Sequence, residues 1–308
     1  MNQSEHKHIE HSSDEISSKN LLITVLLNLI ITIGEFIGGI LSGSLALLSD
    51  ALHNAGDTFS IAISFIAKKI SGRKATNQKT FGYKRIEILS ALFNATTLIA
   101  IAIFLISEAV ERIQEPKAIE TGIMLWVAVL GLIANLVGAL LLHRHSHASL
   151  NIKSAYLHLI GDTISSVAVI AGAIIIQLFD ITWIDPVITI LVSIYLIIES
   201  WKIIKQSTNI LMQAAPGEIE IEAIKNYIKE IDQITDIHHI HIWNLDDKTI
   251  FLEAHLLFKN DLPLSQVDKI RGQIERELKL KFGISHLTLQ SECLVCPNPA
   301  LSDDNHDH

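Results

Sequence analysis

Two segments of the sequence carry the same pair of potential metal ligands at the same spacing. His53 and Asp57 occur as His-x-x-x-Asp, and so do His158 and Asp162, with a glycine directly before each aspartate. Residues four apart lie on one face of a helix, so each segment can present an imidazole and a carboxylate in one direction. Two such helices facing each other would offer two nitrogens and two oxygens, a donor set that suits tetrahedral Zn²⁺.

The surroundings of these pairs are apolar. From Leu21 to about Ile204 the chain alternates long apolar stretches with short polar ones, and each stretch approaches the roughly 20 residues that cross a bilayer. We therefore expect a helical membrane bundle with six transmembrane helices, at 21–42, 45–67, 86–107, 122–142, 155–178 and 186–204.

The second and fifth of these spans contain the His-Asp pairs. Ionisable residues at the bilayer centre cost roughly 2.5–3.5 kcal/mol each, so their presence indicates function. The alternative is that each pair only joins helices by hydrogen bonds. The same spacing in two separate spans favours metal.

A closed set of four ligands favours carrying an ion over catalysis. Catalytic zinc keeps an open position for water, and the sequence contains no His-Glu-x-x-His motif. We therefore expect a transporter and no enzyme. Metal binding requires neutral histidine and ionised aspartate, so it displaces protons, and imidazole titrates near neutral pH. This chemistry predicts exchange of Zn²⁺ for H⁺.

Charge indicates the orientation and excludes one class of partner. The 308 residues carry a net charge of −9, which argues against a nucleic-acid partner.

Residues 1–20 lack the pattern of a signal peptide. Thirteen Lys or Arg lie in the tail and loops that would share one side of the membrane, at 1–20, 68–85, 143–153 and 202–205, and two lie on the other side. Because basic loops stay in the cytosol, both termini are predicted to be cytosolic. The basic loop 68–85 is expected to lie against anionic lipid headgroups.

The C-terminal third has ordinary soluble composition. Helical periodicity at 218–232 precedes two strand-like runs, 236–245 and 249–258, which Asp246–Lys248 separates as a hairpin turn. A second helix at 264–282 and a strand at 284–292 complete the order α-β-β-α-β. We expect a histidine-containing cytosolic tail at 1–20, a transmembrane domain at 21–206, a cytosolic α+β domain at 207–296 and a disordered tail at 297–308.

Three features together resemble the cation diffusion facilitator family, over essentially the whole chain. They are the duplicated His-x-x-x-Asp, the stretch Phe81–Leu89 (FGYKRIEIL) and the segment His238–Trp243 (HHIHIW). The resemblance implies a Zn²⁺/H⁺ antiporter with His53, Asp57, His158 and Asp162 as its transport site. It also implies that the cytosolic domain is ferredoxin-like, or metallochaperone-like, and serves in homodimerisation and metal regulation.

The same resemblance implies paired zinc ions in the cytosolic domain. One ion would be held by His238, His255 and Glu292. The other would be held by His286, Cys293 and Cys296. A tail histidine of a second protomer would complete the set, here His6, His8 or His11.

Several alternatives remain open. A redox role for Cys293-x-x-Cys296 is disfavoured because prolines and a polar tail follow it where a helix would be needed. A membrane metal sensor would need the cytosolic ligands but has no use for ionisable pairs in the bilayer. An organic-solute transporter would lack paired metal ligands. Cd²⁺, Co²⁺ or Ni²⁺ could replace Zn²⁺ at such a site. We expect a bacterial cytoplasmic membrane, with an organelle membrane as the other possibility.

Overall fold

The computed structural model describes residues 26–143 and 150–293. The chain divides into two compact units. The first comprises the chain up to residue 67 together with 90–204, and the second comprises 68–89 together with 205 onwards. Each unit is described by itself below.

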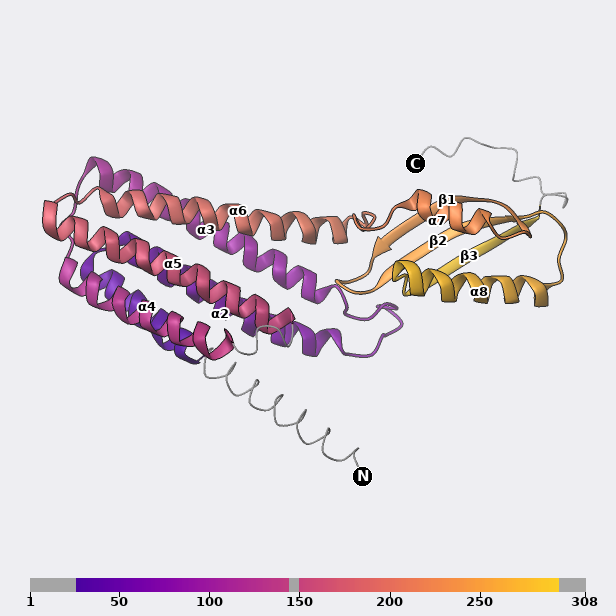
Figure 1. Ribbon diagram of the computed structural model, residues 1–308, viewed down its shortest axis with the longest axis horizontal. Coiled ribbons are helices and arrows are strands. Elements are labelled where there is room, and N and C mark those ends of the chain that lie inside the picture. Colours follow the sequence, from indigo (N-terminus) through magenta and orange to yellow (C-terminus); the bar gives the residue numbers. More distant parts are fainter. Residues whose placement is uncertain (1–25, 144–149, 294–308) are drawn as a thin grey trace, which may run out of the picture. The chain divides into compact units, whose positions relative to one another are not determined.

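The first unit is a bundle of helices that lie side by side (Figure 1). A helix Leu26–Ser42 comes first, and five longer ones follow: α2 (Leu45–Ser71), α3 (Ile86–Gln114), α4 (Thr121–His143), α5 (Leu150–Phe179) and α6 (Ile184–Leu211). Small side chains let α2, α4 and α5 approach closely. Their shared core contains Ala46 and Leu47 from α2, Ala128 from α4 and Val169 and Ala173 from α5.

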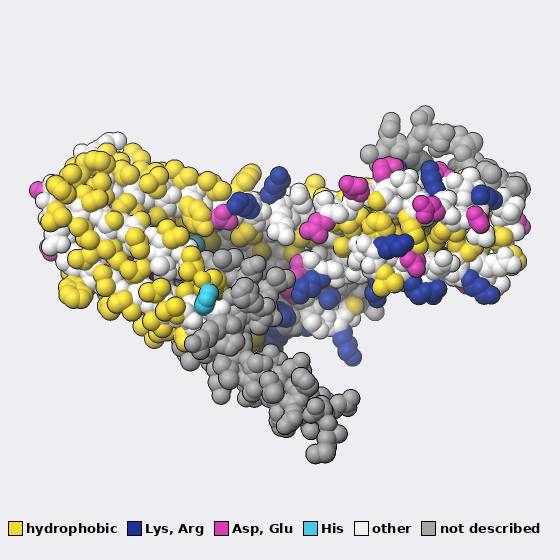
Figure 2. All heavy atoms as spheres, in the orientation of Figure 1, with side chains coloured by type: hydrophobic (Ala, Val, Ile, Leu, Met, Phe, Trp, Pro, Cys, Tyr) yellow, Lys and Arg dark blue, Asp and Glu magenta, His cyan; other side chains and the backbone are white. Residues whose placement is uncertain are grey.

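Apolar side chains cover the outside of this bundle. Hydrophobic atoms fill the face of the unit seen in Figure 2, whereas acidic and basic side chains gather on the unit that contains the sheet. Trp126 and Phe93 are each about two-thirds or more exposed. Such a surface would be unfavourable in water and suits lipid.

Four of the described helices are long and apolar enough to cross a membrane: α3, α4, residues 159–179 of α5, and α6. They overlap the spans predicted at 86–107, 122–142, 155–178 and 186–204. The span predicted at 45–67 corresponds to α2, which carries the ionisable residues. The span predicted at 21–42 corresponds to the shorter apolar helix Leu26–Ser42, and residues 21–25 lie outside the described range.

The second unit contains a three-stranded sheet of β1 (Ile234–Asn244), β2 (Ile250–Phe258) and β3 (His286–Cys293). Two helices, α7 (Ile221–Lys229) and α8 (Leu264–Phe282), pack on it through a core that includes Ile228, Leu256 and Ile274. β1 and β2 are antiparallel and β2 and β3 are parallel, because α8 forms the crossover between the last two. The predicted order α-β-β-α-β and the predicted hairpin are confirmed.

The hairpin turn is closed by Asp246. Its Oδ1 accepts hydrogen bonds from the backbone N–H of Lys248 at 3.0 Å and of Thr249 at 2.7 Å. Burial acts to raise the pKa of Asp246, but these hydrogen bonds and the nearby Lys84 ammonium hold it below the ordinary value. The carboxylate therefore stabilises the turn in its ionised form.

Candidate metal centres

Three of the four predicted transport ligands meet in the interior of the bundle. His53 Nε2 lies 3.6 Å from Asp57 Oδ2 on the same helix and 3.7 Å from Asp162 Oδ1 on α5. Asp162 is almost fully buried, and the side chains of His53 and Asp57 are 17% and 26% exposed. Two atoms bound to one tetrahedral Zn²⁺ at about 2.0 Å lie roughly 3.3 Å apart. Both separations from His53 are within a few tenths of an ångström of that spacing, so the imidazole can share an ion with either carboxylate.

The fourth predicted ligand, His158, lies on α5 one turn before Asp162. Its side chain lies outside the described part of the structure, so its contribution stays a prediction. The glycine before Asp57 has a steric reason. A Cβ added at Gly56 would lie 2.3 Å from Leu98 Cδ2, so an alanine here would require the Leu98 side chain of α3 to move.

Two polar contacts connect α2 to its neighbours beside the ligands. One turn before His53, Asp50 accepts a hydrogen bond from Ser165 Oγ of α5 at 2.6 Å. Next to His53, Asn54 donates to Glu35 Oε2 on the first helix at 2.9 Å, and both side chains are buried. These contacts bring the face of α2 that carries His53 and Asp57 towards α5 and the first helix.

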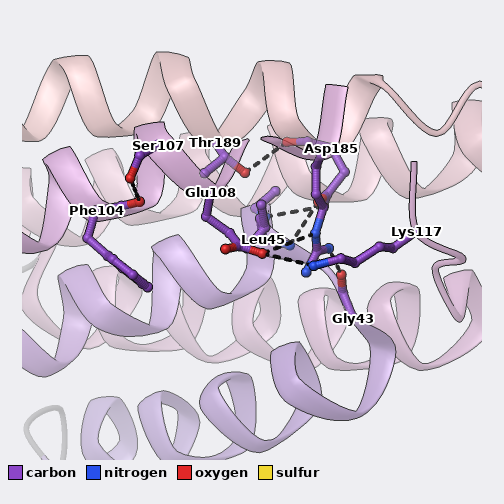
Figure 3. Close-up of polar contacts among 10 residues, drawn as sticks. Gly43, Leu45, Phe104, Ser107, Glu108, Lys117, Asp185 and Thr189 are labelled. Carbon is purple, nitrogen blue, oxygen red and sulfur yellow. Dashed lines mark hydrogen bonds and ion pairs between the residues drawn. The ribbon is translucent and has the colours of Figure 1, made fainter. Parts of the chain in front are cut away.

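A further carboxylate, missed by the sequence reasoning, fixes the beginning of α2. Asp185 of α6 is fully buried and accepts a hydrogen bond from Leu45 N at 2.8 Å (Figure 3). It also accepts hydrogen bonds from Ala46 N at 3.2 Å and Ser44 Oγ at 2.5 Å. It caps α2 from another helix, because the first N–H groups of a helix have no partner within it. The only signal in the sequence was an acidic residue at the start of an apolar span.

An ion-pair cluster from α3 lies at the same end of the bundle (Figure 3). Arg112 donates to the carbonyl of Gly43, in the turn before α2, and its Nε lies 3.9 Å from Glu108 Oε1. Lys117 Nζ lies 3.3 Å from the same oxygen. This cluster and Asp185 connect the start of α2 to α3 and α6.

A second group of ligands lies on the sheet. His255 Nδ1 is 2.9 Å from Glu292 Oε1, and His238 Nε2 is 3.2 Å from Glu292 Oε2. One ligand atom from each residue lies within 4.8 Å of the others, close enough to bind one ion. The sequence reasoning named these three residues for a single ion, and the structure brings them together.

The register of the sheet explains this convergence. His238 and His255 are direct partners across β1 and β2, and Glu292 is opposite Leu257, two residues beyond His255. Side chains two apart in a strand share a face, so Glu292 lies on the face of His255. A bulge follows His238, where His239 adopts a left-handed conformation with φ of 52° and stacks its ring on His255 at 5.0 Å.

The second predicted cytosolic ion is not supported within one chain. His286 and Cys293 are the first and last residues of β3, so their Cα atoms lie about 23 Å apart in an extended strand. The prediction that they share an ion in one protomer is therefore wrong. The His286 ring instead packs against Phe251, 4.6 Å away. Cys296 and the tail residues His6, His8 and His11 lie outside the described residues.

Comparison with known proteins assigns both parts of the chain. Residues 21–212 match the family described as Cation efflux transmembrane domain. The chain belongs to the cation diffusion facilitator family. Residues 216–293 match the family described as Cation efflux protein, cytoplasmic domain. This member of the family is an integral membrane protein, as its apolar helices indicate, and the family is one of transporters.

Full-length relatives support this assignment. The chain is 35% identical over 300 residues to the zinc transporter ZitB of Escherichia coli (strain K12), covering 96% of this chain and 94% of the relative. It is 37% identical over 310 residues to a cadmium, cobalt and zinc/H(+)-K(+) antiporter of Bacillus subtilis (strain 168), covering 97% and 99%. It is 36% identical over 288 residues to the metal cation efflux system protein CzcD of Cupriavidus metallidurans, covering 93% and 90%.

Proposed function

We propose that this transporter exports Zn²⁺ from the cytosol in exchange for H⁺, and that His53, Asp57, His158 and Asp162 bind the ion. The observation that carries the proposal is the position of His53 between Asp57 of its own helix and Asp162 of α5. The donor set is two imidazoles and two carboxylates, which suits Zn²⁺. The names of the ZitB relatives agree with this substrate.

Coupling to protons follows from the chemistry of the ligands. The ion is bound when both histidines are neutral and both aspartates are ionised, and protonation of any of them weakens the site. A site open to the cytosol loads Zn²⁺ and releases protons. A site open to a more acidic exterior takes protons back and releases the ion. The Bacillus relatives are named as zinc/H(+)-K(+) antiporters, which agrees with proton exchange.

We further propose six transmembrane spans with both termini in the cytosol, in a bacterial cytoplasmic membrane. Helix Leu26–Ser42 and α2 add two spans to the four that are apolar enough by themselves, since Asp50 of α2 is buried and the side chains of His53 and Asp57 are only 17% and 26% exposed. The excess of basic residues in one set of loops supports the orientation. The predicted boundaries, a tail at 1–20, a membrane domain at 21–206, a cytosolic domain at 207–296 and a disordered tail at 297–308, belong to this proposal.

For the cytosolic domain, we propose a ferredoxin-like fold that forms a homodimer and binds a regulatory zinc ion at His238, His255 and Glu292. The α-β-β-α-β order and the match to the cytoplasmic domain of cation efflux proteins support the fold and the dimer. The position of Glu292 against both histidines supports the ion site. Three protein ligands leave one position open, which a residue outside the described range or water can fill.

A second candidate is export of other divalent ions through the same site. The Bacillus relatives are named for cadmium and cobalt as well as zinc. Zinc leads here because nitrogen and oxygen ligands suit it, whereas Cd²⁺ favours softer sulfur ligands. A metal sensor without transport is the least supported alternative, because it needs no ligands inside the bundle.

The test is zinc flux into proteoliposomes under an imposed pH gradient. We expect uptake by the native protein and its loss in Asp57→Asn and Asp162→Asn. Asp180→Asn is the matched control, because it removes an exposed carboxylate that follows α5 and asparagine tolerates the same left-handed backbone. Zinc flux that ignores the gradient would refute proton exchange. Flux of Cd²⁺ or Co²⁺ without flux of Zn²⁺ would favour the second candidate, and no flux of any ion would favour the sensor.

A further inference from the structure

The second unit contains a cavity of about 320 Å³ that neither metal site uses. It is formed where residues 79–89 meet Gln213, which follows α6, and the end of β1 at Trp243 and Leu245. Aromatic packing holds these segments together. Phe81 lies edge-on to Phe251 of β2 at 5.5 Å, and Trp243 stacks on the same Phe251 at 5.5 Å.

The charges of this cavity have one sign. Its lining includes Lys79, Lys84 and Arg85, and the described lining residues include no carboxylate. Lys84 Nζ lies 3.9 Å from Asp246, whereas Lys79 Nζ lies over the Tyr83 ring at 4.3 Å. These contacts leave most of the positive charge of the cavity uncompensated.

Arg85 gives the clearest indication of a missing anion. Its Nε is buried and has no hydrogen-bond partner, and its guanidinium forms no ion pair with any residue that the structure describes. A buried donor without a partner is unfavourable by roughly 1–3 kcal/mol, and more when it is charged. Arginine presents a fork of donors that matches the oxygens of phosphate or carboxylate.

The remaining walls indicate what the anion is attached to. Phe81 and Leu89 are 58% and 47% exposed, and Ile86 begins α3, one of the helices long and apolar enough to cross a membrane. The cavity thus adjoins the first turn of a helix that is long and apolar enough to cross a membrane. A phospholipid offers a phosphate for the cations and apolar chains for the exposed side chains of α3.

We propose that this cavity binds the phosphate of an anionic phospholipid such as phosphatidylglycerol, with Arg85 and Lys79 as its principal contacts. The lipid joins the segment 79–89 to β1 of the cytosolic domain. Free inorganic phosphate has the same anionic chemistry, so the test must separate the two sources. The proposal is independent of which metal is transported and of how protons are coupled.

The experiment uses the full-length protein in non-ionic detergent. Phosphatidylglycerol, phosphatidylcholine or inorganic phosphate is added, and bound molecules are counted by native mass spectrometry. We expect saturable binding of phosphatidylglycerol. Lys79→Gln combined with Arg85→Gln should weaken it by about 25-fold, about fivefold for each basic side chain near a phosphate.

The matched control is Lys69→Gln combined with Arg73→Gln. These residues are exposed, lie in the same basic segment and do not line the cavity, so the same loss of charge should leave the affinity unchanged. Arg85→Lys, which keeps the charge, should lose less than Arg85→Gln. Circular dichroism of each variant checks that the protein is folded.

Three outcomes would overturn the proposal. Equal weakening in the control would mean diffuse attraction to the basic segment. Equal binding of phosphatidylcholine would mean that the negative charge is not recognised. Saturable binding of inorganic phosphate without binding of phosphatidylglycerol would make free phosphate the occupant in place of a lipid.

Discussion

Removing the side chain of Asp185 should destabilise the transporter through the beginning of α2. Asp185→Ala deletes the acceptor for the backbone N–H groups of Leu45 and Ala46 and for the hydroxyl of Ser44. The site is fully buried, so water cannot replace the carboxylate without rearrangement. The two N–H groups and the hydroxyl would then remain unsatisfied inside the bundle.

The size of the effect follows from these three donors. An N-cap contributes typically about 1 kcal/mol and up to about 2 kcal/mol, and an unsatisfied buried donor costs roughly 1–3 kcal/mol. Since partial relaxation makes the terms less than additive, we expect a loss of about 3 kcal/mol. Asp185→Asn keeps one acceptor oxygen and should lose about half as much. Glu108→Gln is the control, because the ion pair with the half-exposed Lys117 contributes less than about 1 kcal/mol.

The assay is thermal unfolding of the detergent-purified protein with a fluorescent reporter. A loss of about 3 kcal/mol should lower the midpoint by roughly 6–12 °C for a unit of about 200 residues. Zinc affinity should fall as well. His53 lies on α2, nine residues after Ser44, and Asp185 orients the beginning of this helix. If Asp185→Ala unfolds at the temperature of the Glu108→Gln control, the cap does not hold α2 and the reasoning is refuted.

Three further predictions concern other parts of the molecule. The pKa of Asp246 is lowered in the folded state, so the stabilising effect of this carboxylate is present at neutral pH and is lost as the pH falls through its folded-state pKa. The difference in unfolding free energy between the native protein and Asp246→Asn should therefore shrink from neutral pH to about pH 3. A difference that stays constant over this range would contradict the prediction. Gly131→Ala should destabilise the bundle, since its Cβ would lie 2.4 Å from Glu35 Oε1; an unchanged unfolding temperature would argue against this close contact. Glu292→Gln should reduce bound zinc by one ion per chain in equilibrium dialysis. Glu275→Gln, which removes an exposed carboxylate of α8, is the control. Unchanged stoichiometry in Glu292→Gln would remove the cytosolic site.

The order of the elements could be predicted from the sequence, whereas some of their ends could not. Apolar length and strand alternation are local properties, so the helices and the α-β-β-α-β order follow from them. The third span was predicted to end at residue 107, but α3 continues to Gln114. The polar residues beyond 107 resemble a loop in composition. They remain helical in the structure, and the ion pair between Arg112 and Glu108, one turn apart, supports this part of the helix.

The candidate sites divide in the same way. Spacing within one helix made the His53–Asp57 pair predictable, and its repetition predicted a partner helix. Asp185 and Ser165 were missed because their roles depend on contacts between helices, which no local pattern records. The prediction that His286 and Cys293 share an ion failed for a simple geometric reason. Both residues are potential ligands, but they stand at opposite ends of one extended strand.

The contacts of α2 explain how a simple spacing becomes a site. Three polar contacts hold this helix, each to a different neighbour: Asp185 of α6 at its start, Ser165 of α5 at Asp50, and Glu35 of the first helix at Asn54. In lipid the hydrophobic effect does not drive helices together, so polar contacts act beside van der Waals packing in fixing the rotation of a helix about its axis. The i, i+4 spacing places His53 and Asp57 on one face of α2, but it does not fix which neighbour that face meets. The rotation of α2 about its axis therefore decides whether His53 meets Asp162 of α5. The contacts outside the ligand set therefore determine its geometry, and a change at any one of them should alter metal affinity without removing a ligand.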